Sequence, residues 1–193
     1  MEIEVILLAA GLSKRMGRQK LLLPFGGATV IETVVSNLCA AGFRKINAVL
    51  SREVEAAVRL PEGVFVRINE APERGQSSSL AIGLDMLEEG SDFAIMLGDL
   101  PLVRPEYITA LAKRFSELSC GKTVLAPCRD GVFGHPMFYR AVWKNRFTEA
   151  QGDTGGKTVL MSRADEIERI EASAAHFRDM DTPDEYKRLL AER

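Results

Sequence analysis

The chain alternates short apolar runs with amphipathic stretches from one end to the other. The apolar runs predict strands at Glu4–Ala9, Ile46–Leu50, Val64–Ile68, Phe93–Leu97, Thr123–Ala126, Val132–Phe138 and near Ile167–Ile170. Apolar residues at helical spacing predict helices at Thr29–Ala41, Ser79–Leu87, Pro105–Leu118, Ala141–Glu149 and Pro183–Ala191, with a further helix before the last strand. The strands are continuous apolar runs rather than alternating ones, which is typical of a mainly parallel sheet covered on both faces.

This alternation predicts a single-domain α/β fold with a mainly parallel central sheet flanked by helices. The chain has 193 residues, of which 46% are hydrophobic, and no repeat or linker interrupts it. That length favours one domain, residues 1–193, over two. In open sheets of this kind, ligands bind beyond the carboxyl ends of the strands. The residues that follow each strand are therefore the candidate site.

The composition of the chain excludes several classes of binding partner and of cellular location. The formal net charge is −2, which disfavours a general nucleic-acid or membrane-surface binder. No apolar stretch approaches the ~20 residues needed to span a bilayer, and the N-terminus does not resemble a signal peptide. The three cysteines, Cys39, Cys120 and Cys128, lack zinc-type spacing. We therefore expect reduced thiols in a cytoplasmic protein.

The densest cluster of positive charge follows the first strand. Ala9, Ala10 and Gly11 open this loop, and Arg15 and Lys20 are among the cations that come after them. Small residues let the backbone approach a ligand, and exposed amides can form an anion-binding concavity. Arginine and lysine can neutralise phosphate oxygens, arginine in a bidentate manner. The segment is neither a Walker A loop nor GxGxxG, and a solvated basic loop is the alternative interpretation.

A second candidate segment follows the strand Val64–Ile68. The sequence GQSSS at 75–79 leads into a helix, whose free first-turn amides favour an anion or a polar base edge. One serine would be enough to cap the helix, so capping alone is the alternative interpretation.

Two carboxylates are candidate metal ligands. Asp99 follows the strand Phe93–Leu97 and faces the same crevice as the basic loop. A carboxylate beside phosphates needs a cation between them, and Mg²⁺ bound by one or two carboxylates plus substrate phosphates meets that need. Asp181, just before the last helix, could share this metal or cap the helix. An ordinary turn aspartate is the alternative for Asp99.

Two further segments could contact a second substrate. GVFGHPMFYR at 131–140 carries His135, one of two histidines, and QGDTGGK at 151–157 carries Asp153. A structural histidine with satisfied hydrogen bonds and a simple turn are the alternative interpretations.

Together these segments resemble a known family. LAAGLSKRMGRQKLLLPFGG, GQSSSLAIGL, LGDLPLV, FGHPMFYR, GDTGGK and DMDTPDEY follow the order of the nucleotidyltransferases with a glycosyltransferase-A-like fold, from Leu8 to about Leu190. More narrowly, the chain resembles the molybdenum-cofactor cytidylyltransferases, which are related to the molybdenum-cofactor guanylyltransferases. The resemblance implies the Rossmann-like fold of nucleotide-diphospho-sugar transferases.

The resemblance also implies a role for each matched position. Arg15, Lys20 and Asp99 would be catalytic, and Asp99 and Asp181 would bind Mg²⁺. His135 and Asp153 would lie towards the acceptor, a pterin cofactor with a terminal phosphate. The nucleotide-binding positions would be Ala9, Ala10, Gly11, Ser13, Arg15, Lys20, Gln76, Ser77, Ser78 and Gly98.

The implied reaction is transfer of CMP from CTP to a molybdopterin-type cofactor, with a molybdoenzyme as candidate recipient. Ala10 favours cytosine, since LAAG is similar to the CTP-using members and guanylyltransferases tend to show LAGG. Leu100 stands where the family often has methionine, and GGATVIE lacks the lysine that is usual after the LLLPFGG turn. The alternatives are a nucleotidyltransferase of another specificity (GTP, or a sugar or polyol phosphate acceptor) and a non-catalytic protein that binds the cofactor. The paired carboxylates disfavour the last of these.

Overall fold

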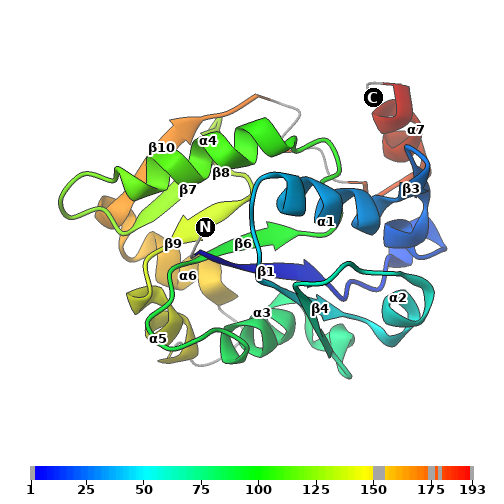
Figure 1. The fold of residues 1–193 in the computed structure, drawn as a ribbon, viewed down its shortest axis with the longest axis horizontal. Coiled ribbons are helices and arrows are strands. Elements are labelled where there is room, and N and C mark those ends of the chain that lie inside the picture. Colours follow the sequence, from blue (N-terminus) through cyan, green and yellow to red (C-terminus); the bar gives the residue numbers. More distant parts are fainter. Residues whose placement is uncertain (1–2, 150–154, 174–176, 178–179, 192–193) are drawn as a thin grey trace.

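The structure, a computed structural model, describes residues 3–149, 155–173, 177 and 180–191. In this part of the chain a central sheet carries helices on both faces (Figure 1). Its strands are β1 (Glu4–Ala9), β4 (Ile46–Leu50), β5 (Val64–Ile68), β6 (Phe93–Leu97), β7 (Val124–Arg129), β8 (Val132–Phe133), β9 (Met137–Tyr139) and β10 (Ile167–Glu171). A separate ribbon pairs β2 (Pro24–Phe25) with β3 (Ala28–Thr29).

The strand order across the sheet is β10-β7-β9-β6-β1-β4-β5, and β8 pairs with β7. Strands β6, β1, β4 and β5 are parallel to their neighbours within this group, and β10 is parallel to β7. Strand β9 lies between β6 and β7 and runs antiparallel to both. The sheet is therefore mainly parallel, as the continuous apolar runs predict, with an antiparallel strand in its interior.

The two faces of the sheet carry separate hydrophobic cores, because successive side chains of a strand point to opposite faces. In β1, Val5 and Leu7 enter one core, and Ile6 and Leu8 enter the other. The first face is covered by α1 (Val30–Ala40) and α4 (Pro105–Ser116), and the second by α3 (Gln76–Asp85), α5 (Val142–Glu149) and α6 (Gly155–Met161) (Figure 1). The helices α2 (Arg52–Ala57) and α7 (Pro183–Ala191) pack on the first core. Within the described ranges no helix has the length and apolar character needed to cross a membrane.

Local sequence signals account for the starts of α1 and α4. Thr29 caps α1 in a reciprocal arrangement with Glu32, and Pro105 occupies the first turn of α4. The expectation of one strand over Val132–Phe138 is wrong, since β8 and β9 are separate strands. Pro136 lies in the interruption and has no N–H to donate to a ladder, which favours the break.

Strand β5 is more exposed than its apolar sequence predicts. Phe65 and Val66 are 52% and 39% exposed. The strand lies at the end of the sheet, so it has a neighbouring strand on one side only. For this strand the expectation of cover on both faces is wrong.

The carboxyl ends of β1 and β6 lie side by side. The register pairs Leu8 with Leu97, and the N–H of Gly98 donates to the Leu8 carbonyl at 2.9 Å. A Cβ at position 98 would lie 2.9 Å from the Cβ of Ala9, so the close approach of the two ends requires glycine. The loop after β1 and the aspartate after β6 consequently share one edge of the sheet.

Candidate active site

The loop after β1 is held in shape by its own side chains. Gln19 is buried, and its Nε2 donates to the Gly11 carbonyl at 3.1 Å while its Oε1 accepts from the Ser13 hydroxyl at 2.8 Å. The Ser13 hydroxyl in turn accepts from the N–H of Lys20 at 3.1 Å. Ser13 has a φ of 50°, which is uncommon outside glycine and is maintained here by these bonds. Gln19 therefore fixes the position from which Lys20 leaves the loop.

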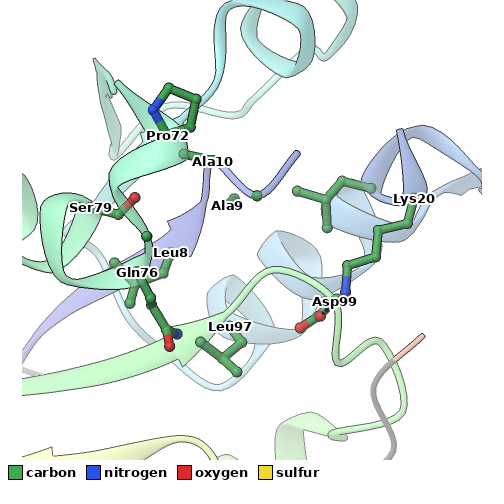
Figure 2. Close-up of a pocket in the computed structure, with 12 residues that line it drawn as sticks. Leu8, Ala9, Ala10, Lys20, Pro72, Gln76, Ser79, Leu97 and Asp99 are labelled. Atoms are coloured by element: carbon green, nitrogen blue, oxygen red, sulfur yellow. Dashed lines mark hydrogen bonds and ion pairs between the residues drawn. The ribbon is translucent and has the colours of Figure 1, made fainter. Parts of the chain in front are cut away.

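Four charges meet at the end of this loop. Lys20 Nζ lies 2.5 Å from Asp99 Oδ2 and 2.7 Å from Asp181 Oδ1, and Arg15 forms an ion pair with the other oxygen of Asp181. The side chain of Lys20 is 13% exposed and that of Asp99 is 14% exposed, whereas that of Arg15 is 73% exposed. Figure 2 shows Lys20 and Asp99 pointing toward each other. The cluster joins segments that are far apart in the sequence.

Electrostatics keep this cluster charged. Burial by itself would lower the pKa of Lys20, but the carboxylates of Asp99 and Asp181 outweigh burial and raise that pKa. Burial by itself would raise the pKa of Asp181, but Lys20 and Arg15 outweigh burial and lower that pKa. At neutral pH Lys20 is therefore an ammonium and Asp181 a carboxylate.

The start of α7 leaves the Asp181 carboxylate free to face Lys20. The Glu185 carboxylate accepts from the N–H groups of Asp181 and Thr182 at 2.9 and 2.8 Å. The Thr182 hydroxyl accepts from the N–H of Glu185 at 3.3 Å, so Thr182 and Glu185 form a reciprocal cap. The interpretation of Asp181 as the helix cap is therefore wrong.

A cavity of about 250 Å³ lies between this loop and the start of α3, and we call it the loop cavity (Figure 2). It brings together predicted residues from three strand ends. Its lining consists of Leu8, Ala9, Ala10, Gly11, Lys20, Leu21, Pro72, Gly75, Gln76, Ser79, Leu97 and Asp99. The predicted nucleotide-binding residues Ser13, Arg15, Ser77, Ser78 and Gly98 do not line it, and their binding roles stay predictions.

The start of α3 is organised by an asparagine rather than by a serine cap. Gly75, with a φ of 87°, is the residue before the helix, and no side chain caps it, so the capping interpretation of the serines is wrong. Asn69, buried at the end of β5, donates from Nδ2 to the hydroxyls of Ser78 and Ser79, both at 2.9 Å. Its Oδ1 accepts from the N–H of Ala71 at 2.9 Å. Asn69 thus positions the helix that forms one wall of the loop cavity.

A second cavity of about 610 Å³ adjoins the loop cavity, and we call it the apolar cavity. The two cavities share Leu8 and Gln76 as lining residues, and the apolar cavity also contains Ser77 and His135. Nδ1 of His135 lies 3.0 Å from the Ile95 carbonyl. Burial lowers the pKa of His135, outweighing the Ile95 carbonyl and the charge of Asp99, which both act to raise it. Asp153, the other predicted acceptor residue, lies outside the described residues.

Sequence reasoning did not single out Gln19 or Asn69. Both are buried amides whose partners lie in neighbouring loops. Their only sequence signal is proximity to a candidate segment, Gln19 beside Lys20 and Asn69 at the end of a predicted strand.

Asp99 and Asp181 would supply part of the coordination of a metal, and a bound substrate would supply further ligands. The oxygens of Asp99 and Asp181 converge on one point, the Nζ of Lys20. Carboxylate oxygens are ligands that Mg²⁺ prefers. The part of the chain that the structure describes has no group of three or more histidine, cysteine, aspartate or glutamate residues that could hold a metal by itself. The residues thus fit a metal whose other ligands are phosphate oxygens and water.

The sequence model of a protein family, the MobA-like NTP transferase domain, matches residues 5–167 of the chain. The chain belongs to this family. It is therefore a nucleotidyltransferase of the MobA-like family, with a single-domain α/β fold. This membership agrees with the resemblance seen in the sequence.

Proteins that are similar in sequence to this chain carry different names. The chain is 25% identical to the molybdenum cofactor cytidylyltransferase of Escherichia coli, covering 95% of this chain and 93% of that protein. It is 27% identical to the nicotine blue oxidoreductase of Paenarthrobacter nicotinovorans, covering 96% and 95%. The bifunctional GlmU of Fervidobacterium nodosum is 29% identical over 79% of this chain, but the chain spans only 34% of its length.

The fold is also similar to that of solved structures. The crystal structure of Rv0371c from Mycobacterium tuberculosis superposes with a TM-score of 0.82 and 26% identity, covering 99% of this chain and 98% of that one. Rv0371c has also been solved in complex with manganese, with a TM-score of 0.76. A divalent metal is thus compatible with this fold.

Proposed function

We propose that the chain transfers CMP from CTP to the terminal phosphate of a molybdopterin-type cofactor and releases pyrophosphate. The observation that carries this proposal is the convergence of Lys20, Asp99 and Asp181 beside the loop cavity. Full-length similarity to a molybdenum cofactor cytidylyltransferase supports the choice of acceptor. The chain is similar over nearly its full length to an oxidoreductase as well, so the identity of the nucleotide and that of the acceptor both need a direct test.

In this proposal the loop cavity takes the nucleoside, and the basic loop takes the triphosphate. The cavity volume of about 250 Å³ lies below the ~300–1,000 Å³ of sites that enclose whole drug-sized ligands, which suits one part of a nucleotide. A Cβ added at Gly11 would meet no atom within 4 Å, so its small size leaves open space for a ligand. Lys20 and Arg15 would exchange carboxylate oxygens for phosphate oxygens when the nucleotide binds.

Asp99 and Asp181 would hold the divalent metal together with the phosphates. Their oxygens lie 2.5 and 2.7 Å from one cationic atom, so both already face a single cation position. When bound, the metal would neutralise negative charge on the phosphate oxygens.

Transfer of the nucleotidyl group requires positioning and charge stabilisation rather than a covalent intermediate. An oxygen of the acceptor phosphate attacks the α-phosphorus of the nucleotide, and the new P–O bond forms as the bond to the β-phosphate oxygen breaks. The acceptor phosphate is an anion at neutral pH, so the site needs no general base. Lys20 and Arg15 would stabilise the pyrophosphate as it leaves.

Thermal unfolding with CTP, GTP and ATP, each with and without Mg²⁺, tests the nucleotide. A ligand that binds only the folded state stabilises it by about 2.7 kcal/mol at a hundredfold excess over Kd. A magnesium-dependent shift that is largest for CTP supports the proposal, and a preference for GTP favours the guanylyltransferases. No shift with any nucleotide favours a protein that only binds the cofactor.

Asp99→Ala tests the metal site. We expect it to abolish pyrophosphate release and to leave the thermal unfolding of the free protein close to wild type. Asp184→Ala is the matched control, because that carboxylate is 81% exposed on α7 and, among the described residues, its ion-pair partner is Lys187. Near wild-type turnover in Asp99→Ala would refute the metal role.

A further inference from the structure

Strand β5, the last strand of the sheet, has main-chain groups that face away from its neighbour β4. In a parallel pair, alternate residues of a strand direct their N–H and C=O groups toward the neighbouring strand. The carbonyl of Gly63 and the N–H of Asn69 bond to β4, so the odd-numbered residues between them face β4 as well. Val64, Val66 and Ile68 consequently direct their N–H and C=O groups outward, where a further strand would bond to them.

This edge lacks the features by which proteins usually prevent strand pairing, such as proline, a bulge or unpaired charge. The segment 64–68 contains no proline, and its register with β4 is continuous over five residues. Its charged side chain, Arg67, forms an ion pair with Asp85 of α3. Among the described residues, none bonds to the outward main-chain groups of Val66 or Ile68. The edge of β5 is therefore open to a partner strand.

The side chains of β5 are suited to pairing with a second copy of the same strand. If two copies pair antiparallel about a two-fold axis at Val66, Val64 of one copy lies opposite Ile68 of the other. Val66 then lies opposite its own equivalent, so this face of the pair is apolar. On the other face Phe65 lies opposite Arg67, which allows a cation–π contact and separates the two arginines. The pairing covers both exposed apolar side chains of the strand, Phe65 and Val66.

The main-chain groups favour the same position of the axis. Opposite residues of an antiparallel pair alternate between exchanging two hydrogen bonds and exchanging none. An axis at Val66 places all three outward-facing residues in hydrogen-bonded pairs. The N–H of Val64 already donates to the Pro61 carbonyl at 3.3 Å, so the donors of this pairing are the N–H groups of Val66 and Ile68 in each copy. An axis at Arg67 would instead set two like charges opposite each other.

We propose that β5 is an interaction surface for a second copy of this chain, with which it forms an antiparallel strand pair about a two-fold axis at Val66. The symmetry makes the interface isologous, since the same residues act on both sides. Five residues from each copy are fewer than the ~20–30 per side of a standard interface, so we expect a weak dimer with a Kd on the order of 10–100 μM. The inference is independent of the proposed function.

Sedimentation velocity from about 5 to about 500 μM protein measures this association. The sedimentation coefficient of the wild-type protein should rise with concentration from that of a monomer to that of a dimer. Val66→Lys sets two like charges opposite each other at the axis and should weaken the dimer at least about tenfold, as should Val66→Glu. Val142→Lys is the matched control, because Val142 is also an exposed apolar residue but lies on α5. It should leave the association unchanged.

An equimolar mixture of Val66→Lys and Val66→Glu distinguishes the proposed pairing from damage to the fold. The axis sets the lysine of one copy opposite the glutamate of the other, so the mixture should dimerise although neither variant does so alone. A mixture that stays monomeric overturns the proposed register, and dimerisation of Val66→Lys alone overturns β5 as the surface. A wild-type chain that stays monomeric at about 500 μM overturns the second copy as the partner of this edge and favours an extended segment of another protein.

Discussion

Replacing Lys20 with methionine removes one positive charge from the centre of the charge cluster and keeps a side chain of similar length. In the structure, Lys20 Nζ bridges Asp99 and Asp181 at 2.5 and 2.7 Å and is 13% exposed. After the replacement Asp181 keeps its ion pair with Arg15, whereas Asp99 has no ion-pair partner among the described residues. The variant therefore isolates what Lys20 does for nucleotide and for metal.

We expect Lys20→Met to lower kcat/KM. If Lys20 stabilises the departing pyrophosphate as other preorganised charged donors do, its removal costs about 2–4 kcal/mol of transition-state stabilisation. That corresponds to a kcat/KM lower by roughly 30- to 900-fold. Pyrophosphate release at limiting CTP measures it directly.

We expect Lys20→Met to bind a divalent metal more tightly than the wild-type protein when no nucleotide is present. In the wild-type protein a metal must displace Lys20 from two carboxylates, which costs about the 1.5–3 kcal/mol of a hydrogen bond to a charged group. Methionine removes this competition, so Mn²⁺ should bind about 10- to 150-fold more tightly in Lys20→Met. The two effects have opposite signs, and general damage to the fold would produce only the loss.

Titration of Mn²⁺ followed by electron paramagnetic resonance measures the gain, with Lys113→Met as the matched control. Lys113 is exposed on α4 and forms no ion pair with the described residues. Unchanged kcat/KM in Lys20→Met would remove Lys20 from the mechanism. Unchanged or weaker Mn²⁺ binding would show that Lys20 does not compete for the position between the two carboxylates.

Four other substitutions test the packing of α3, the loop cavity and an ion pair elsewhere in the fold. A Cβ at Gly83 would lie 2.4 Å from Ile6 Cγ2, so Gly83→Ala should lower the free energy of unfolding in urea by about 1–3 kcal/mol. A Cβ at Gly11 would meet no atom within 4 Å, so Gly11→Ala should leave that free energy unchanged and weaken nucleotide binding. Asn69→Ala should raise the KM for nucleotide more than it lowers kcat, because Asn69 orders the wall of the loop cavity; an unaltered KM would contradict this role. The hydrogen bond from Arg146 lowers the pKa of Glu166 in the folded protein. The ionised Glu166 carboxylate therefore stabilises the fold above the unfolded pKa of about 4.3, and this stabilisation is lost as pH falls through the folded pKa. Glu166→Gln should therefore be less stable by about 1.5–3 kcal/mol at pH 7, and its difference from wild type should shrink below about pH 4, which urea unfolding across pH would check.

The hydrophobic pattern of the chain determined the four neighbouring parallel strands of the sheet. The predicted strands Glu4–Ala9, Ile46–Leu50, Val64–Ile68 and Phe93–Leu97 have the same bounds in the structure. Thr29 marks the start of its helix through a local cap. These features depend on contacts a few residues apart and on periodicity, so the sequence carries them directly.

The tertiary structure decided how these elements meet. Strand order cannot be read from apolar runs, because an interior strand such as β9 has the same apolar character whether it runs parallel or antiparallel. Exposure of β5 follows from its place at the edge, not from its sequence.

The same division holds for the site. The sequence identified Lys20, Asp99 and Asp181 as residue types suited to phosphate and metal, and family membership agrees with that chemistry. Their convergence on one point required packing of segments separated by 79 and 161 positions. The contact of His135 with the Ile95 carbonyl and the hydrogen bonds of the buried amides Gln19 and Asn69 likewise depend on backbone groups and hydroxyls that only the folded chain brings within hydrogen-bond distance.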